Sequence, residues 1–151
     1  MRFVRRLLVV AATVLVLGLP ASAVADTPTQ MRAVVRAWSA RLNANDNAGI
    51  ARLFALPAQV IQAPYAFTLR TRAEVAEWYA GLPCSGRVVT ITVRGRYATA
   101  VFKLGNRGST PCDAPGSLAA ARFEIVGGKI RSWEQVAVPA AKQNPPSPGA
   151  A

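Results

Sequence analysis

Side chains that could transfer protons or bind a metal ion are scarce in this sequence. Its 151 residues include seven aspartate and glutamate residues and no histidine, which excludes an imidazole base and an imidazole metal ligand. Asp46 and Glu74 stand where helix caps are expected, and Glu124 and Glu134 could pair with arginines on neighbouring strands. A buried carboxylate is the usual mark of proton transfer, and only Glu134 is a candidate for it. No catalytic residue, metal or cofactor is therefore predicted. Whether the protein is an enzyme stays open, and the sequence favours a protein without enzymatic activity.

The two cysteines predict a structural disulfide. They are too few for a four-cysteine zinc site or an iron–sulfur cluster, and Cys84 and Cys112 lack the Cys-x-x-Cys spacing of a redox pair. Closing a loop of about 29 residues would contribute roughly 3–4 kcal/mol. Both cysteines fall at the same end of a predicted hairpin of residues 87–94 and 96–104, so their α-carbons could approach within about 7 Å.

The first 25 residues have the pattern of a secretory signal peptide. Arg2, Arg5 and Arg6 precede an apolar run from Leu7 to Leu19, and Ala23-Val24-Ala25 forms a small-x-small cleavage pattern. About 13 apolar residues are too few to span a bilayer. Cleavage would remove three arginines and lower the net charge from +11 to +8. We expect a secreted or extracytoplasmic protein, in a compartment where disulfides form.

The basic residues are spread along the chain instead of forming a dense run. No nucleic-acid-binding motif accompanies them, so no nucleic acid is expected as a partner. At most, a weak association with anionic lipid or cell-wall polymer is expected.

Three helices are predicted in the first half of the chain. Residues 28–43 carry one apolar stripe that includes Met31, Val35 and Trp38, and Thr27 can cap this helix. A second helix is predicted from Asp46 to Ala55, ended by Pro57. The third starts at Thr71, where Thr71 and Glu74 have the spacing of a capping box.

Strands dominate the second half. A short strand is predicted at Gln59–Gln62, with Tyr65–Leu69 as its partner. After the third helix the apolar pattern alternates with a period of two. This alternation predicts four strands, at residues 87–94, 96–104, 118–126 and 129–138. The four prolines of residues 139–151 indicate a disordered tail. Residues 26–138 therefore form one domain of the α+β class.

The order of these elements resembles the SnoaL-like branch of the nuclear transport factor 2-like superfamily. The segments that carry the resemblance are Val34-Val35-Arg36-Ala37-Trp38, Leu42-Asn43-Ala44-Asn45-Asp46, Ile50-Ala51-Arg52-Leu53-Phe54, Thr71-Arg72-Ala73-Glu74-Val75-Ala76-Glu77-Trp78-Tyr79 and Gly128-Lys129-Ile130-Arg131-Ser132-Trp133. The resemblance implies a cone-shaped α+β barrel, in which a curved antiparallel sheet wraps around the N-terminal helices. It also implies an apolar pocket that takes small apolar molecules, and many members form homodimers.

The catalytic groups of these enzymes have no acidic counterparts here. Ketosteroid isomerase-like members use an aspartate near the end of the first strand, a tyrosine on the first helix and a buried acid on a later strand. The matching positions here are Gln62 or Ala63, Trp38 and Ala121. Limonene epoxide hydrolase-like members have the sequence Trp-Arg-Asp near the end of the domain, and its aspartate takes part in acid–base catalysis. The matching stretch here is Trp133-Glu134-Gln135, where an amide replaces the acid. SnoaL-type cyclases also need an acid and often a histidine.

The resemblance and the strand alternation together give a predicted lining for the pocket. Its aromatic and amide residues are Trp38, Gln62, Tyr65, Trp78, Phe123, Trp133 and Gln135. Aromatic rings opposite small alanines leave room for a ligand, although they could equally interlock as an ordinary core. Tyr79 and Tyr97 are further polar groups that could orient a ligand.

These observations favour non-catalytic binding of a small apolar ligand. Two alternatives stay open at this point. One is a divergent isomerase, cyclase or hydrolase of the same fold, which would need a carboxylate facing the pocket. The other is a dimerisation or partner-docking module whose pocket is filled by its own side chains, which would need an exposed apolar patch.

Overall fold

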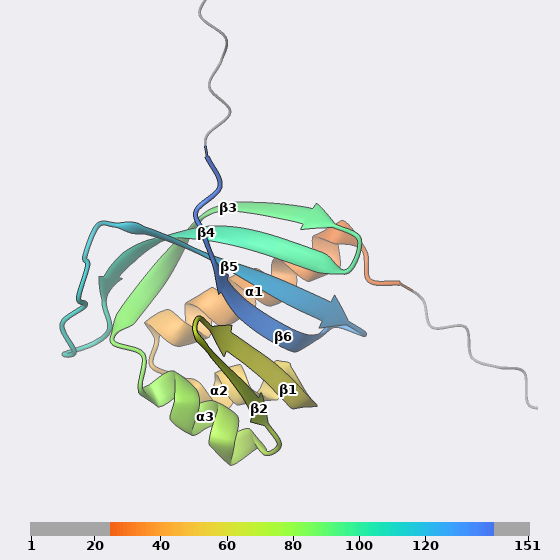
Figure 1. Ribbon diagram of the computed structural model, residues 1–151, viewed down its shortest axis with the longest axis horizontal. Helices are drawn as coiled ribbons and strands as arrows, with labels where there is room; N and C mark the ends of the chain where they lie inside the picture. Colours follow the sequence, from red (N-terminus) through yellow and green to blue (C-terminus); the bar gives the residue numbers. More distant parts are fainter. Residues whose placement is uncertain (1–24, 141–151) are drawn as a thin grey trace, which may run out of the picture.

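The computed structural model describes residues 25–140 and consists of three helices and one curved six-stranded sheet (Figure 1). The predicted signal peptide, apart from Ala25, and residues 141–151 of the predicted tail lie outside the described residues. The α+β class is confirmed, and the sheet curves around the first helix without closing. No helix between residues 25 and 140 is long and apolar enough to cross a membrane.

The first helix, α1, spans Pro28–Asn43 as predicted. Thr27 caps it, because its side chain accepts a hydrogen bond from the backbone N–H of Gln30 while the Gln30 side chain accepts one from the backbone N–H of Thr27. The predicted apolar stripe is its buried face and includes Met31, Val35 and Trp38. This face packs against the inner side of the sheet.

The second helix, α2, is shorter than predicted. It spans Asn47–Arg52, and Phe54 and Ala55 already belong to a strand. Pro57 therefore does not end the helix and instead lies inside that strand. Asp46 caps α2 as expected, by accepting a hydrogen bond of 2.7 Å from the backbone N–H of Gly49.

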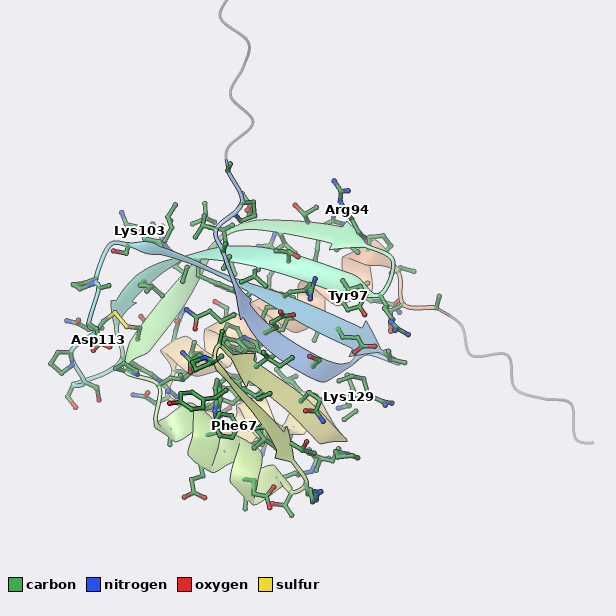
Figure 2. All side chains as sticks on the ribbon, in the orientation of Figure 1. Phe67, Arg94, Tyr97, Lys103, Asp113 and Lys129 are labelled. Carbon is green, nitrogen blue, oxygen red and sulfur yellow. A yellow bond between two sulfur atoms is a disulfide. The ribbon has the colours of Figure 1, made fainter. Side chains whose placement is uncertain are left out.

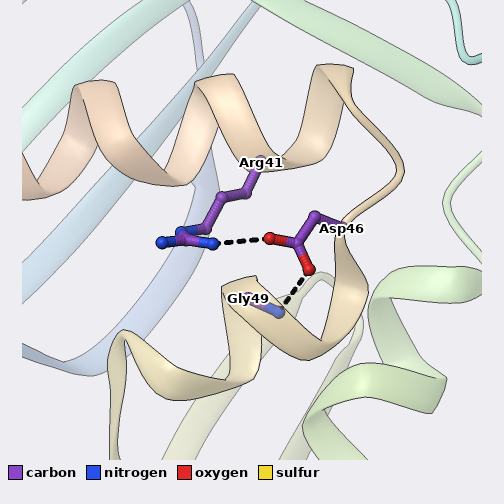
Figure 3. A network of polar contacts seen from close by, with 3 residues as sticks. All are labelled: Arg41, Asp46 and Gly49. Carbon is purple, nitrogen blue, oxygen red and sulfur yellow. Dashed lines mark hydrogen bonds and ion pairs between the residues drawn. The ribbon is translucent and has the colours of Figure 1, made fainter.

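Asp46 also joins the end of α1 to the start of α2 (Figure 3). Its second oxygen accepts a hydrogen bond of 2.5 Å from the Arg41 guanidinium. The Gly49 backbone N–H, followed by Arg41, lowers the pKa of the Asp46 carboxyl, because both interactions favour the charged form. A Cβ atom at Gly49 would overlap the Asp46 carboxylate, so a residue without a side chain is needed there.

The third helix, α3, spans Arg72–Ala80. Its cap differs in one detail from the predicted capping box. Thr71 accepts a hydrogen bond from the backbone N–H of Glu74, but the Glu74 carboxylate accepts one from the N–H of Arg70 instead of that of Thr71. The carboxylate still satisfies a free backbone N–H just before the helix.

The six strands lie in the order β2-β1-β6-β5-β4-β3. Their bounds are β1 Phe54–Gln62, β2 Tyr65–Leu69, β3 Cys84–Arg94, β4 Tyr97–Asn106, β5 Leu118–Val126 and β6 Lys129–Val136. All neighbouring pairs are antiparallel except β1 and β6, which are parallel. The resemblance implied an antiparallel sheet. The one parallel pair joins distant parts of the chain, because α3 carries the chain from β2 to β3 at the far edge and the strands then return in order until β6 lies beside β1.

The inner face of the sheet and the buried face of α1 enclose the core. The ring of Trp38 lies 5.1 Å from that of Phe123 and 5.4 Å from that of Phe102, measured between centroids. Tyr79 on α3 contacts Trp38 with an edge-to-face angle of 72°. This aromatic cluster packs beneath the candidate site and includes part of its lining.

Candidate functional site

A cavity of about 240 Å³ lies between α1, the inner face of the sheet and the loop after β4. Its buried wall consists of large apolar side chains, including Trp38, Leu42, Phe102 and Trp133. Alanines of β5 also line it; they are Ala119, Ala120 and Ala121. Because strand side chains alternate, Ala119 and Ala121 point to the same face of the sheet as Trp133 of β6, and their small size leaves the space open.

The rim of the cavity contains the disulfide. Cys84 at the start of β3 is bonded to Cys112 in the loop between β4 and β5, with the α-carbons 4.5 Å apart. The predicted pairing is therefore present, and it holds the loop residues Asp113 and Ala114 against the cavity. Figure 2 shows the bond beside Asp113 at one end of the sheet.

Two glutamine side chains form a hydrogen bond at this cavity. The Gln62 Nε2 group at the end of β1 donates to Oε1 of Gln135 on β6, over 2.9 Å. Both residues line the cavity, and Gln135 is exposed while Gln62 is half-buried. The amide pair therefore lies at the open end, and the aromatic rings lie at the buried end.

Three buried polar atoms of the described residues have no hydrogen-bond partner. They are Nε1 of Trp38, Nε1 of Trp133 and the hydroxyl of Tyr79. Burial raises the pKa of Tyr79 well above its ordinary value, because a phenolate there would lack water. The Trp38 indole opposes this shift, although it does not reach hydrogen-bonding geometry. Trp38 and Trp133 line the buried end of the cavity, and Tyr79 packs behind them against Trp38.

Four of the seven predicted lining residues meet at the cavity: Trp38, Gln62, Trp133 and Gln135. Two others lie directly behind it, since Phe123 packs under Trp38 and Trp78 packs edge-on against Trp133 with centroids 5.2 Å apart. Tyr65 does not reach the cavity. It is 65% exposed on the edge strand β2 and stacks on Phe67, because β2 lies beyond β1 at the sheet's edge.

The predicted carboxylate pairs lie on the outer face of the sheet. Glu134 binds Arg122 over 2.5 Å, and Glu124 binds Arg96 over 3.1 Å. Glu134 therefore points away from the cavity, as the alternation with Trp133 requires. The cavity lining contains one ionisable side chain, the exposed Asp113, which strand alternation could not place because it lies in a loop.

Arg107 is a structural residue that the sequence reasoning missed. It directly follows β4, is 3% exposed and pairs with no carboxylate among the described residues. Its guanidinium donates to the backbone oxygens of Leu42, Tyr79 and Leu82, and to the Asn47 side chain. Burial lowers the pKa of Arg107. The cation thus joins the C-terminal ends of α1 and α3 below the cavity rim.

A second hollow, of about 670 Å³, lies on the outer face of the sheet. It is lined by threonines and arginines of β3, β4 and β5, and by Val138 and Pro139 after β6. Tyr97, labelled in Figure 2, is on this face. The guanidinium carbons of Arg96 and Arg122 lie 5.6 and 5.5 Å from the centroid of its ring. Val89, Leu118 and Val138 are exposed apolar residues here, so the apolar surface is interrupted by polar groups.

Comparisons with known proteins identify the fold. No family model and no curated protein matches the chain. A candidate ketosteroid isomerase from Kribbella flavida superposes with a TM-score of 0.58 at 19% identity, covering 78% of this chain and 84% of that one. A candidate polyketide cyclase from Sinorhizobium meliloti gives 0.56 at 18%, covering 71% and 98%.

A third solved structure, an NTF2-like protein from Cytophaga hutchinsonii, gives a TM-score of 0.56 at 11% identity and covers 70% of this chain and 87% of that one. These identities are low, so the likeness concerns the fold alone. The chain has the fold of the SnoaL-like and nuclear transport factor 2-like proteins.

Proposed function

We propose that this protein binds a small apolar molecule in the cavity between α1 and the sheet, without chemical turnover. The observation that carries the proposal is the composition of the lining: indole, phenyl and aliphatic groups around an open volume, with two neutral amides at the mouth. Ligand pockets have this composition, apolar walls with a few polar groups that orient the ligand.

The volume limits the size of the ligand. An engineered apolar cavity of about 150 Å³ holds benzene, whereas drug-sized ligands need roughly 300–1,000 Å³. The cavity here, at about 240 Å³, lies between these values. A ligand with one or two rings therefore fits better than a whole steroid, of which only a part could enter.

The absence of an acid–base pair supports binding over turnover. The positions that match the catalytic groups of ketosteroid isomerase-like and epoxide hydrolase-like enzymes include Gln62, Trp38, Ala121 and Gln135, and all four line this cavity. None of them can accept a proton from carbon or supply one to an oxyanion with the strength of an acid. With neutral side chains at these four positions, the cavity can hold a ligand but has no proton-transfer path through them.

The test is a thermal-shift screen of small aromatic and alicyclic compounds, followed by quenching of tryptophan fluorescence. We expect binding compounds to raise the melting temperature, because a ligand that binds only the folded state stabilises it. Ala119→Leu should fill part of the cavity and abolish the shift. Ala66→Leu, an exposed alanine on β2, is the matched control and should keep it. A broad library without any shift would contradict the proposal.

Turnover has its own control. Asp113 is the ionisable group on the described lining. If this cavity catalysed a proton transfer, either Asp113 or a water molecule would have to act as the base. If a bound compound is chemically converted, and Asp113→Asn stops the conversion while binding persists, the proposal of simple binding is wrong.

We also propose that the protein is exported and cleaved after Ala25. The disulfide supports this, because such bonds persist mainly in oxidising compartments. Mass spectrometry of the protein recovered from its native host should give a mature chain starting at Asp26 with two hydrogens missing. A full-length chain with free thiols would contradict export.

A further inference from the structure

The amide pair at the cavity mouth has hydrogen-bonding groups left over. In the bond between Gln62 and Gln135, each side chain uses one polar atom. No other hydrogen bond from a described residue reaches either amide head. One carbonyl oxygen and at least one amide hydrogen stay free, and this holds whichever way the two amides are turned.

The pair is fixed in place by the sheet. Gln62 ends β1 and Gln135 lies on β6, the strand parallel to it, one residue beyond Glu134, which pairs with Ile61. Both side chains come from the face that carries Val60 and Trp133. A donor and an acceptor thus lie side by side on two paired strands, each two residues along its strand from Val60 or Trp133.

The charge at the mouth excludes one class of head group. No arginine or lysine is among the lining residues, and the one ionisable side chain is the acidic Asp113. An anionic head would find no cationic partner among the lining residues and would lie near the carboxylate of Asp113. A neutral head that carries both a donor and an acceptor would instead form two hydrogen bonds with the amide pair.

We propose that the ligand is a small aromatic or alicyclic molecule with a neutral amide-type head, such as a primary carboxamide or a lactam. This inference rests on the proposed function, because it assigns the ligand's apolar body to the cavity. The head pairs with Gln62 and Gln135 and the ring lies towards Trp133. A carboxylate of the same shape is rejected.

Three compounds of one shape test this proposal: benzamide, benzoate and α-methylstyrene, the hydrocarbon that replaces the amide by carbon. Tryptophan fluorescence measures their affinities for the full chain at pH 7. Two extra hydrogen bonds predict that benzamide binds about tenfold more tightly than α-methylstyrene, and that benzoate binds more weakly than benzamide by at least as much.

Two variants locate the effect. Gln62→Leu and Gln135→Leu should each abolish the preference for benzamide over α-methylstyrene, measured as the ratio of the two affinities in the same variant. Gln59→Leu is the matched control, because Gln59 lies on the opposite face of β1, where it bonds with Thr68. It should behave like the unaltered protein. Circular dichroism confirms that each variant is folded.

The outcomes separate the two proposals. If α-methylstyrene binds and benzamide has no advantage, or if Gln59→Leu loses the preference as the other two do, the amide inference is wrong and the apolar site remains. If no compound binds and the wider library also gives no thermal shift, the proposed function itself is wrong.

Discussion

The Tyr79 hydroxyl is fully buried and has no hydrogen-bond partner among the described residues. Replacing it by hydrogen keeps the ring that packs on Trp38 and Phe54. We expect Tyr79→Phe to leave the free energy of unfolding unchanged or to raise it by up to about 1 kcal/mol, because it removes an unsatisfied polar group. Urea unfolding at pH 7 measures this. A loss of more than about 1 kcal/mol would mean that the hydroxyl has a partner.

The same residue predicts how stability changes at high pH. In the unfolded chain the phenol loses its proton near its ordinary pKa of 10.0, whereas burial keeps it protonated in the folded protein to a higher pH. Above about pH 10 the unfolded state then binds fewer protons than the folded state, so stability falls as pH rises. Tyr79→Phe should flatten this decline. Equal declines in the variant and the original protein would contradict the assignment to Tyr79.

Among the structural elements, the ends of α1 and α3 depend on a residue from neither helix. Arg107 donates to carbonyl groups at both ends and to Asn47 at the start of α2. Arg107→Met would leave several of these acceptors without donors in a buried place. We expect it to lower the free energy of unfolding by about 2–4 kcal/mol.

Arg107→Lys is the informative companion variant. A single ammonium keeps the charge but cannot span the same set of acceptors as the planar guanidinium. It should lose an intermediate amount of stability in the same urea titration. If both variants unfold like the original protein, the hydrogen bonds to the helix ends do not stabilise the fold.

The loop between β4 and β5 depends on the disulfide. Cys84 and Cys112 are 28 residues apart in sequence, and closing a loop of that length stabilises a folded chain by roughly 3–4 kcal/mol in the chain-entropy description. We expect the double variant Cys84→Ser, Cys112→Ser to lose about that much in denaturant unfolding. Adding a reductant to the original protein should have a similar effect. An unchanged midpoint in both experiments would show that Arg107 and the strands hold this loop without the bond.

For the molecule as a whole, elements with a clear period were predictable and irregular connections were not. The apolar stripe of residues 28–43 defined α1. Alternation put Trp133 and Gln135 on one face of their strand, and the family resemblance indicated that this face is the inner one. The start of β1 was not predictable, because Phe54 continues the helical spacing of Ile50 while its backbone pairs with Ile130, far along the chain. Long-range pairing outweighed the local pattern there.

The candidate site also has a part that was predictable from the sequence and a part that was not. Its strand and helix residues follow from periodicity. Asp113 and Arg107 instead occupy a loop whose path is set by the disulfide and by hydrogen bonds to distant helix ends. Tyr65 has the right chemistry for a ligand site but lies on the edge strand. Residue type alone gives no information on strand order, and strand order decides which aromatic residues meet.

The net charge of the whole molecule gives a last prediction. Residues 25–140 carry fourteen arginine and lysine residues and seven acidic ones, and the described ion pairs are three. Most of the positive charges therefore repel one another across a small surface, which destabilises the compact state.

We expect the melting temperature to rise by a few degrees as NaCl increases from about 10 mM to about 200 mM, since the screening length falls to below roughly 10 Å. Choline chloride should act alike, because the effect comes from screening and not from binding of sodium. A melting temperature that falls with salt would show that the three ion pairs outweigh the repulsion.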